Sequence, residues 1–517
     1  MRMRHLMLAL CSAAIPAGLS AQQPAQIPVD TTGTGALIDE GMNRSEVMKN
    51  LMYLTDVIGP RLTGSPAARA ANDWTLKRFQ DYGLTGHLEP WNFGGTWTRG
   101  PMWARLVAPR THDLVAASWA WTVGTDGKTV RGPVVRIDAS TPESLAANRA
   151  RVKGAWVMLA GPTMVWNNDG PPMTAADSQR QRDFFRRAFG PVAGLDSVQR
   201  AARIQFQNDV PYILRNAGAL GQLLDAGKEQ DLLNMSGSPT RIYPHPRLVV
   251  AHEDYALLDR LLQAGVAPQV EANISNAMTT DSVPQWNTIA EIPGTELPGE
   301  VVIVGAHLDS WDLGTGASDN GTGSMATLEA ARIIARSGLK PKRTIRFILF
   351  TGEEEGLIGS RKYAEAHAGD ADSIQAVIVL DNGVGAITGQ ALQGRPDLYG
   401  LWRALLAPVH SLNADTVTDA NKGGTDHLSF LPYGVPGFNF NQITRGYNHT
   451  HHSQSDTWDK AIDWDLRQAS TVMAVSAYEL ANLPTMIPRG AKRTVQPLAA
   501  AKISDSLTVR PRARGRQ

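Results

Sequence analysis

The sequence predicts an α/β fold in which a mixed, mostly parallel sheet is sandwiched between helices. Two apolar runs, at residues 301–306 and 345–350, have the length and β-branched content of buried parallel strands. Between them, residues 322–337 carry apolar side chains at helical spacing, and Gly338 and Pro341 follow as helix-ending residues. Together these segments form a strand–helix–strand unit, the building block of such a sheet.

The same alternation of strand and helix patterns covers two separate parts of the chain, one before residue 111 and one from residue 286 to 483. Length and flanking turn residues set the expected bounds. The expected helices are at 45–58, 67–82, 396–410 and 464–483, the last with Asp463 as N-cap, and the further strands are at 87–93, 375–380 and 436–441.

Between residues 111 and 270 the alternation changes to shorter strand and helix patterns. Strands are expected at 130–137 and 155–159, and helices at 195–208 and 255–264. A lone His245 lies between two prolines, where a turn residue is a better interpretation than a metal ligand. Because no cluster of reactive side chains accompanies these elements, we interpret the segment as an inserted lid that shapes or covers the substrate crevice.

These patterns divide the chain into five parts, in keeping with its 517 residues. The predicted parts are a signal peptide at 1–21, the first part of the catalytic domain at 22–110, the insertion at 111–270, the main catalytic part at 271–489 and a flexible basic tail at 490–517.

The first 21 residues have the basic start, apolar run and small-residue cleavage site of a secretory signal peptide. The apolar run is shorter than the about 20 residues that span a bilayer. We therefore expect an exported protein, periplasmic or secreted, without a stable membrane span. Cys11 is the only cysteine, so the mature chain has no disulfide or thiolate chemistry. A net charge of +1 and no basic stripe with interleaved aromatics argue against nucleic-acid binding.

Acid–base side chains follow the predicted strands at their carboxyl ends. His307 and Asp309 follow the first strand, and glutamates 353–355 follow the second. In an open α/β sheet the functional crevice lies outside the carboxyl ends of the strands. We therefore expect these groups to converge there with Asp319, on the loop that enters the helix.

A metal site in the mature chain has to use His, Asp and Glu, and carboxylates mixed with imidazoles suit zinc. Five such groups exceed one tetrahedral site, but they close two sites if one carboxylate bridges. Two ions about 3.5–4 Å apart form the clamp of aminopeptidases and phosphatases, and the hydroxide that they hold is the nucleophile for hydrolysis. The five groups at or near strand ends are His307, Asp319, Glu354, Asp381 and His452.

Several motifs resemble the M28 family of co-catalytic zinc peptidases: GAHLDSWDLGTGASDNGTG, TGEEEG, GGTDHLSF and HHSQSDTWD. Within that family, HLDSWDLGTGASDNGTG and KPKRTIRFILFTGEEEG look closest to the carboxypeptidase Q (plasma glutamate carboxypeptidase) branch, and GPRLTGSP near the N-terminus also fits. The resemblance covers residues 45–93 and 286–483. It implies the α/β/α fold of zinc exopeptidases, a protease-associated (PA-like) insertion and a homodimer.

The resemblance also implies a role for each polar side chain at the strand ends. Asp319 would bridge two zinc ions. His307 and Asp381 would complete one metal site, and Glu354 and His452 would complete the other. Glu353 would act as general base and acid, and Asp309 would orient the His307 imidazole.

The residues alone leave two assignments open: which of three consecutive glutamates act, and which of three histidines is the last ligand. The three consecutive glutamates allow two pairings, and the Glu-Glu-x-Gly pattern of the family selects Glu353 and Glu354. His449, His451 and His452 compete for the last ligand position, and the family spacing before the Asp-Thr pair at 456–457 selects His452. His451 would then contact substrate.

The leading hypothesis is an exported di-zinc metallo-exopeptidase that cleaves short peptides or dipeptides through a metal-bridging hydroxide and Glu353. An aminopeptidase or an N-acyl amino-acid amidohydrolase could use the same site. A metal-free binding or receptor-type module ranks last, because all the ligand positions are filled. A carboxypeptidase needs Arg or Lys for the terminal carboxylate, for which Arg445, Lys422 and Arg361 are candidates, whereas an aminopeptidase needs an acidic group for the ammonium.

Overall fold

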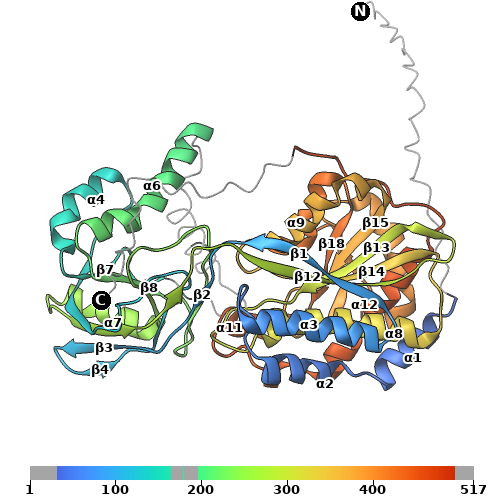
Figure 1. The fold of residues 1–517 in the computed structure, drawn as a ribbon, viewed down its shortest axis with the longest axis horizontal. Helices are drawn as coiled ribbons and strands as arrows, with labels where there is room; N and C mark the ends of the chain where they lie inside the picture. The colour runs from blue at the N-terminus through green and yellow to red at the C-terminus, as the bar shows by residue number, and fades with distance from the viewer. Residues whose placement is uncertain (1–31, 164, 166–178, 180–195, 495–517) are drawn as a thin grey trace, which may run out of the picture.

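The computed structural model describes residues 32–163, 165, 179 and 196–494 (Figure 1). The predicted signal peptide and most of the predicted tail therefore lie outside the described residues, as does most of the stretch from 161 to 191. Two eight-stranded sheets lie side by side, joined through the small ribbon of β2 (Trp97–Thr98) and β11 (Ala277–Met278).

The first sheet, here the main sheet, has the strand order β1–β12–β14–β13–β15–β18–β16–β17. Its four central strands, β14, β13, β15 and β18, run parallel, while β1 and β12 add antiparallel pairs at one edge. The strands are β1 (Thr85–Phe93), β12 (Val283–Ile292), β13 (Leu297–His307), β14 (Arg343–Phe350), β15 (Ile374–Val379), β16 (Ile387–Ala391), β17 (Thr416–Thr418) and β18 (Gly437–Gln442).

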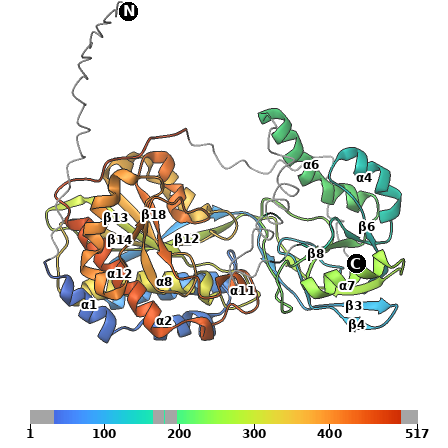
Figure 2. The same cartoon turned by 180° about the vertical axis from the view of Figure 1, so that it is seen from behind.

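Helices cover both faces of the main sheet (Figures 1 and 2). Along β13, Val302 and Val304 pack in one core with α8 and α12, whereas Ile303 packs in another core with α9. Each such fully buried aliphatic side chain contributes about 1.5–3 kcal/mol. The helices are α1 (Thr34–Asn43), α2 (Val47–Met52), α3 (Pro66–Asp81), α8 (Thr322–Ser337), α9 (Ile358–Ala366), α10 (Tyr399–Leu406) and α12 (Asp463–Asn482).

The elements agree with the sequence pattern most closely where that pattern is long. Helix α8 has the expected bounds, and Gly338 ends it in the left-handed conformation, with φ of 74°. Helix α10 ends at Leu406 and continues only as a 3-10 turn, because Pro408 has no N–H to donate to the helix. The expected cap is wrong: Asp463 is the first residue of α12, where its carboxylate pairs with Arg467 at 2.9 Å.

The second sheet, here the inserted sheet, has the order β4–β3–β10–β6–β7–β8–β9–β5. It takes in β3, which lies before the expected start at residue 111, because β3 pairs with β10 along its length. Its elements are β3 (Met102–Ala108), β4 (His112–Asp113), β5 (Ala116–Ser118), β6 (Val130–Arg136), β7 (Trp156–Met158), β8 (Gly221–Asp225), β9 (Arg247–Val250), β10 (Gln269–Ile274) and the helices α4 (Pro142–Asn148), α6 (Ser197–Asn216) and α7 (His252–Gln263).

An aromatic cluster packs the inserted sheet against the main sheet. Trp121 of the insertion contacts Phe93, Trp97 and Trp311, at ring-centroid distances of 6.0, 6.3 and 6.3 Å. Aromatic pairs of this kind add about 0.5–1.5 kcal/mol beyond the area that they bury. Within the described part of the chain, no helix combines the length and the apolar character that crossing a membrane requires.

Candidate metal centre

The predicted ligands come from neighbouring strands of the main sheet. His307 is the last residue of β13, which lies between β14 and β15, so the segments after all three strands meet at one edge. Glu353 and Glu354 follow β14, and Asp381 follows β15. Asp319 belongs to the short turn that leads into α8.

The first group of ligand atoms surrounds the His307 imidazole. His307 Nε2 lies 3.3 Å from Asp319 Oδ1 and 3.5 Å from Asp381 Oδ1. All three residues are buried, and their ligand atoms lie within 4.8 Å of one another. This is the set that the sequence predicts for one of the two metal positions.

The second group lies on the other side of Asp319. His452 Nε2 is 3.1 Å from Glu354 Oε2 and 3.3 Å from Asp319 Oδ2. Asp319 therefore points one oxygen toward His307 and the other toward His452, as a bridging carboxylate would. His451 stacks on His452 with a ring-centroid distance of 3.7 Å, and its Nε2 lies 3.7 Å from Asp319 Oδ2. The structure thus brings His451 to the second group as well.

Several polar atoms of this cluster fit the places of metal ligands. Among the described residues, His307 Nε2, Asp319 Oδ2 and Glu354 Oε1 are buried without a hydrogen-bond partner. Buried polar atoms without a partner are rare, and each costs about 1–3 kcal/mol. Burial, followed by the neighbouring Asp319 charge, raises the pKa of Glu354 well above its usual range. Divalent cations between the two groups would satisfy these atoms and offset the carboxylate repulsion, so the residues fit a two-metal centre.

Glu353 lies at the edge of the first group, with its Oε2 3.8 Å from His307 Nε2. Burial raises the pKa of the Glu353 carboxyl well above its usual range, His307 opposes the rise, and Asp381 adds to it. Glu355 is also buried. Among the described residues, the clusters whose ligand atoms all lie within 4.8 Å of one another are His307–Asp319–Asp381 and Asp319–His451–His452, and none of the three glutamates belongs to them.

The main-chain carbonyl and the carboxylate of Asp309 both lie beside the His307 imidazole. The ring nitrogen Nδ1 of His307 lies 3.1 Å from the main-chain carbonyl of Asp309, whereas the Asp309 carboxylate is 3.7 Å away, beyond hydrogen-bond range. Asp309 Oδ2 instead accepts from Thr63 Oγ1 at 3.0 Å and from the Glu354 N–H at 3.2 Å. The main-chain carbonyl accepts from the imidazole, and the carboxylate lies within ion-pair distance of the same ring nitrogen and accepts from the backbone of Glu354. The orienting role of the Asp309 carboxylate stays a prediction.

The turn that carries Asp319 has a buried anchor that the sequence analysis missed. Asp456 accepts from the Ser318 N–H at 2.5 Å through Oδ1 and from the Asp319 N–H at 3.1 Å through Oδ2. Burial raises the pKa of Asp456 to about 6, while the bonds from Ser318 oppose the rise. Asp456 served in the sequence analysis only as a spacing marker for His452, and nothing local in the sequence points to its contact with Ser318.

Arg61, in the GPRLTGSP loop, is a second missed anchor. Its guanidinium is fully buried and donates to the carbonyls of Leu308 at 2.7 Å, Thr315 at 2.8 Å and Gly316 at 2.7 Å. Gly316 has φ of 63°, and a Cβ there would meet Ser310 at 2.3 Å. The family-like loop motif points to this segment, but nothing local in it shows that Arg61 is buried against carbonyls about 250 positions away.

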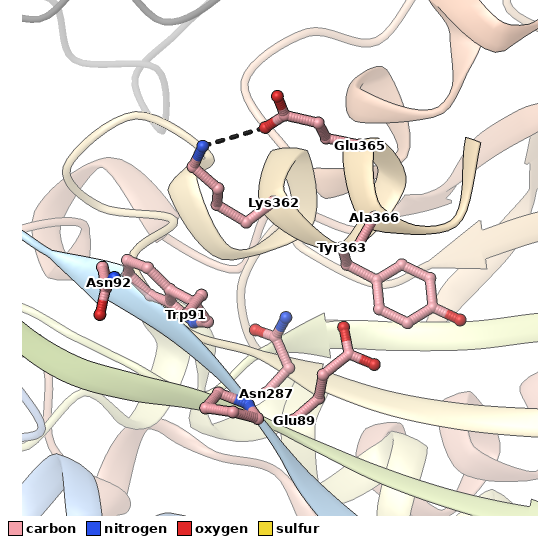
Figure 3. A pocket seen from close by; sticks show the side chains of 9 residues that line it. Glu89, Trp91, Asn92, Asn287, Lys362, Tyr363, Glu365 and Ala366 are labelled. Carbon is pink, nitrogen blue, oxygen red and sulfur yellow. Dashed lines mark hydrogen bonds and ion pairs between the residues drawn. The ribbon is translucent and has the colours of Figure 1, made fainter. Parts of the chain in front are cut away.

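A separate pocket of about 400 Å³ lies between β1 and α9 (Figure 3). Glu89 and Trp91 from β1 face Tyr363 across it, and Lys362 pairs with Glu365 at 2.9 Å on its rim. None of the predicted ligands lines this pocket, so it is distinct from the metal centre.

Comparison with known proteins also indicates a peptidase of family M28. The model of peptidase family M28 matches residues 287–477. Carboxypeptidase Q of Mus musculus is 30% identical over 457 residues, which cover 88% of this chain and 89% of that protein. A peptidase M28 precursor from Shewanella amazonensis SB2B has a TM-score of 0.72 and 24% identity, covering 89% of this chain and 99% of the other. A zinc aminopeptidase from Bacillus subtilis has a TM-score of 0.59 and 18% identity, covering 88% and 97%.

Fold, site and relatives together define the class of protein, a metallopeptidase built on an α/β/α sheet. The chain belongs to peptidase family M28, and it is similar to carboxypeptidase Q over most of its length. The predicted fold class and the predicted family are both confirmed.

Proposed function

We propose that the chain is an exopeptidase that uses two zinc ions to hydrolyse short peptides, including dipeptides. The observation that carries the proposal is the position of Asp319, whose two oxygens face two separate sets of ligand atoms. His307 and Asp381 would hold one ion with Asp319, and Glu354 and His452 would hold the other. Membership of family M28 supports a peptidase, and the mixed carboxylate and imidazole donors support zinc.

Glu354, rather than His451, completes the second position in this proposal. Glu354 Oε1 is buried without a hydrogen-bond partner among the described residues, so it needs a cation. The His451 side chain is 42% exposed, and water can solvate it. His451 therefore stays available to contact substrate at the edge of the site.

The proton transfers of peptide hydrolysis fall to Glu353. When bound, the zinc ions would lower the pKa of a water molecule and polarise the scissile carbonyl. The Glu353 carboxylate, which is 11% exposed beside the His307 ring, takes the proton of the attacking water and delivers it to the leaving amine. General acid–base catalysis of this kind contributes about 10²–10⁴-fold. Trp311 packs against the His452 ring at 5.9 Å and limits the access of solvent from that side.

Metal analysis combined with a peptide assay tests this function. The purified mature protein should contain about two zinc ions per chain, hydrolyse dipeptides and lose both zinc and activity to a chelator. Re-addition of zinc should restore activity, with magnesium as the control ion because it prefers an all-oxygen octahedral site. Full activity in protein that contains one metal ion or none would contradict the proposal.

Export and self-association are further proposals. The signal-like residues 1–21 support cleavage near Ala21 and a periplasmic or secreted location. Mass spectrometry of the mature protein would overturn this if its N-terminus were Met1. The homodimer implied by the family resemblance stays a prediction, which sedimentation measurements would test.

A further inference from the structure

The inserted sheet contacts the metal centre through the segment between β8 and β9. That segment lies against residues 447–456, here called the ligand loop because it carries His452. The Met235 N–H donates to the His452 carbonyl at 2.9 Å, and the Leu233 N–H donates to the Gln454 side chain at 2.8 Å. These bonds fix the position of the segment beside the second group of ligand atoms.

Lys228 stands at the start of this segment and reaches the ligand loop with its side chain. Its ammonium donates to the carbonyl of His451 at 2.8 Å and to the carbonyl of Asn448. An ammonium has three hydrogens, so one of them is left for another acceptor. In the described part of the chain, no carboxylate lies close enough to Lys228 to form an ion pair. The side chain is half-buried, so its positive charge is partly desolvated, and it has no ion-pair partner among the described residues.

The charge of Lys228 also lies within electrostatic reach of the metal centre. Burial lowers the pKa of Lys228 to about 8, and the charges of Asp319 and Asp456 oppose that shift. The bond to the His451 carbonyl holds the Lys228 ammonium next to His452 in the chain. An unpaired cation held rigidly at the edge of a hydrolytic site is suited to bind an anionic part of the substrate.

The cations expected from the sequence are less suited to this role. Arg445 pairs with the buried Asp465 at 2.8 Å, so its charge is already compensated. Arg361 is exposed on the surface of α9. Lys422 is half-buried, and burial alone lowers its pKa, but none of its contacts joins it to the ligand loop. Lys228 differs from all three in its direct contact with the loop that carries His452.

We propose that Lys228 binds the terminal carboxylate of the peptide, so that the inserted sheet selects substrates with a free C-terminus. This inference rests on the proposed peptidase function. In a carboxypeptidase reaction the terminal carboxylate belongs to the residue next to the scissile bond, and one residue spans roughly 3.8 Å. The group that binds the carboxylate must therefore lie near the metal ligands, and Lys228 contacts the carbonyl of His451, the residue before His452. Two main-chain carbonyls hold the ammonium in place, and the substrate carboxylate takes the remaining hydrogen.

The test compares Lys228→Met with wild type on two substrates that differ only at the C-terminus. Both are N-blocked dipeptides, one with a free carboxylate and one with a carboxamide. For the free carboxylate, kcat/KM should fall about 10–100-fold, mainly through KM, as expected for a hydrogen bond to a charged group. For the amide, kcat/KM should stay as in wild type. Lys228→Arg should recover part of the loss, because it keeps the charge.

The zinc content of Lys228→Met and the activity of Lys422→Met distinguish carboxylate binding by Lys228 from a role that only supports the ligand loop. Zinc content should be unchanged in Lys228→Met, and Lys422→Met should keep the wild-type preference for the free carboxylate. Equal losses on both substrates, or loss of zinc, would show that Lys228 only supports the ligand loop and would overturn the inference. A selective loss in Lys422→Met instead would overturn it as well. Zinc-loaded wild type that cleaves a free dipeptide but neither N-blocked peptide would overturn this inference alone, whereas failure to cleave the free dipeptide as well would overturn the peptidase proposal.

Discussion

The main sheet and the inserted sheet have equal numbers of strands but differ in what those strands bury. In β13, β14 and β15, consecutive residues are buried along most of each strand, because helices cover both faces of the main sheet. In β6 and β10 only alternate residues are buried, whereas β7, β8 and β9 bury consecutive residues, so the inserted sheet is partly exposed on one face at β6 and β10. The acid–base groups gather at the carboxyl ends of the doubly covered strands, whereas the described part of the inserted sheet reaches the ligand loop through the segment between β8 and β9.

This difference separates two tasks. The segments after β13, β14 and β15 converge because parallel strands end at one edge, and this convergence supplies the ligand atoms. The inserted sheet adds contacts around those atoms, from Met235 to His452 and from Lys228 to His451. We expect substitutions in the main sheet to abolish metal binding or chemistry, and substitutions in the inserted sheet to change selectivity or local stability.

The largest expected effect separates two adjacent glutamates of the main sheet. Glu353→Gln keeps the shape of the side chain but removes its basicity, so kcat should fall about 10²–10⁴-fold while zinc stays bound. Glu354→Gln weakens a ligand, so zinc affinity should fall by more than the roughly 10–100-fold that is typical of losing a group that only supports a ligand. Zinc titration measures the zinc affinity of both variants, and steady-state kinetics measures their kcat. If Glu353→Gln loses zinc and Glu354→Gln does not, the two roles are reversed.

The next effect concerns the buried arginine under the centre. Arg61→Met leaves the carbonyls of Leu308, Thr315 and Gly316 without their donor. With about 1–3 kcal/mol for each unsatisfied buried group, the free energy of unfolding should fall by about 3–5 kcal/mol. Urea unfolding of metal-free protein measures this, with Lys77→Met as a control because the Lys77–Asp81 pair lies on the surface of α3. A loss no greater than that of the control would show that Arg61 is not an anchor.

The sequence predicted best what local patterns encode. The bounds of α8 follow from its apolar spacing and from Gly338. Residue types near strand ends indicate where ligands gather, but only the family resemblance selects Glu354 and His452 among their neighbours, and this choice stays a prediction. Such signals need only a short window of sequence. They fail where a local rule is overridden, as in α6, which was expected to end at residue 208 but continues through Pro211 to Asn216.

Contacts between distant segments could not be predicted from the sequence alone. Arg61 meets Gly316 across 255 positions, and Lys228 meets His451 across 223. No periodicity or spacing links such residues, and a lysine in a loop usually faces solvent. The bond from Thr63 to the Asp309 carboxylate likewise joins two loops that no spacing in the sequence links.

The last expected effect, which is absent at neutral pH and grows only in acid, lies in the inserted sheet at His245. The bend between Pro244 and Pro246 was expected, but the structure buries His245 to 2% exposure. Neither ring nitrogen has a hydrogen-bond partner among the described residues. Burial, reinforced by the charges of Arg247 and Arg215, lowers the pKa of His245 from its ordinary 6.5 to about 3. The folded protein therefore keeps this imidazole neutral where the unfolded chain would bind a proton.

The sign of the pH dependence follows from this difference in proton binding. The neutral imidazole is compatible with the fold above pH 6.5, and its contribution to stability is lost as pH falls from about 6 toward 3. The loss has a limiting slope of roughly 1.4 kcal/mol per pH unit for one proton. His245→Leu removes the titrating group, so its free energy of unfolding should fall less steeply over this range than that of wild type. The exposed His87→Leu should keep the wild-type slope. Urea unfolding at several pH values measures all three proteins, and parallel curves for wild type and His245→Leu would show that His245 does not make the inserted sheet acid-sensitive.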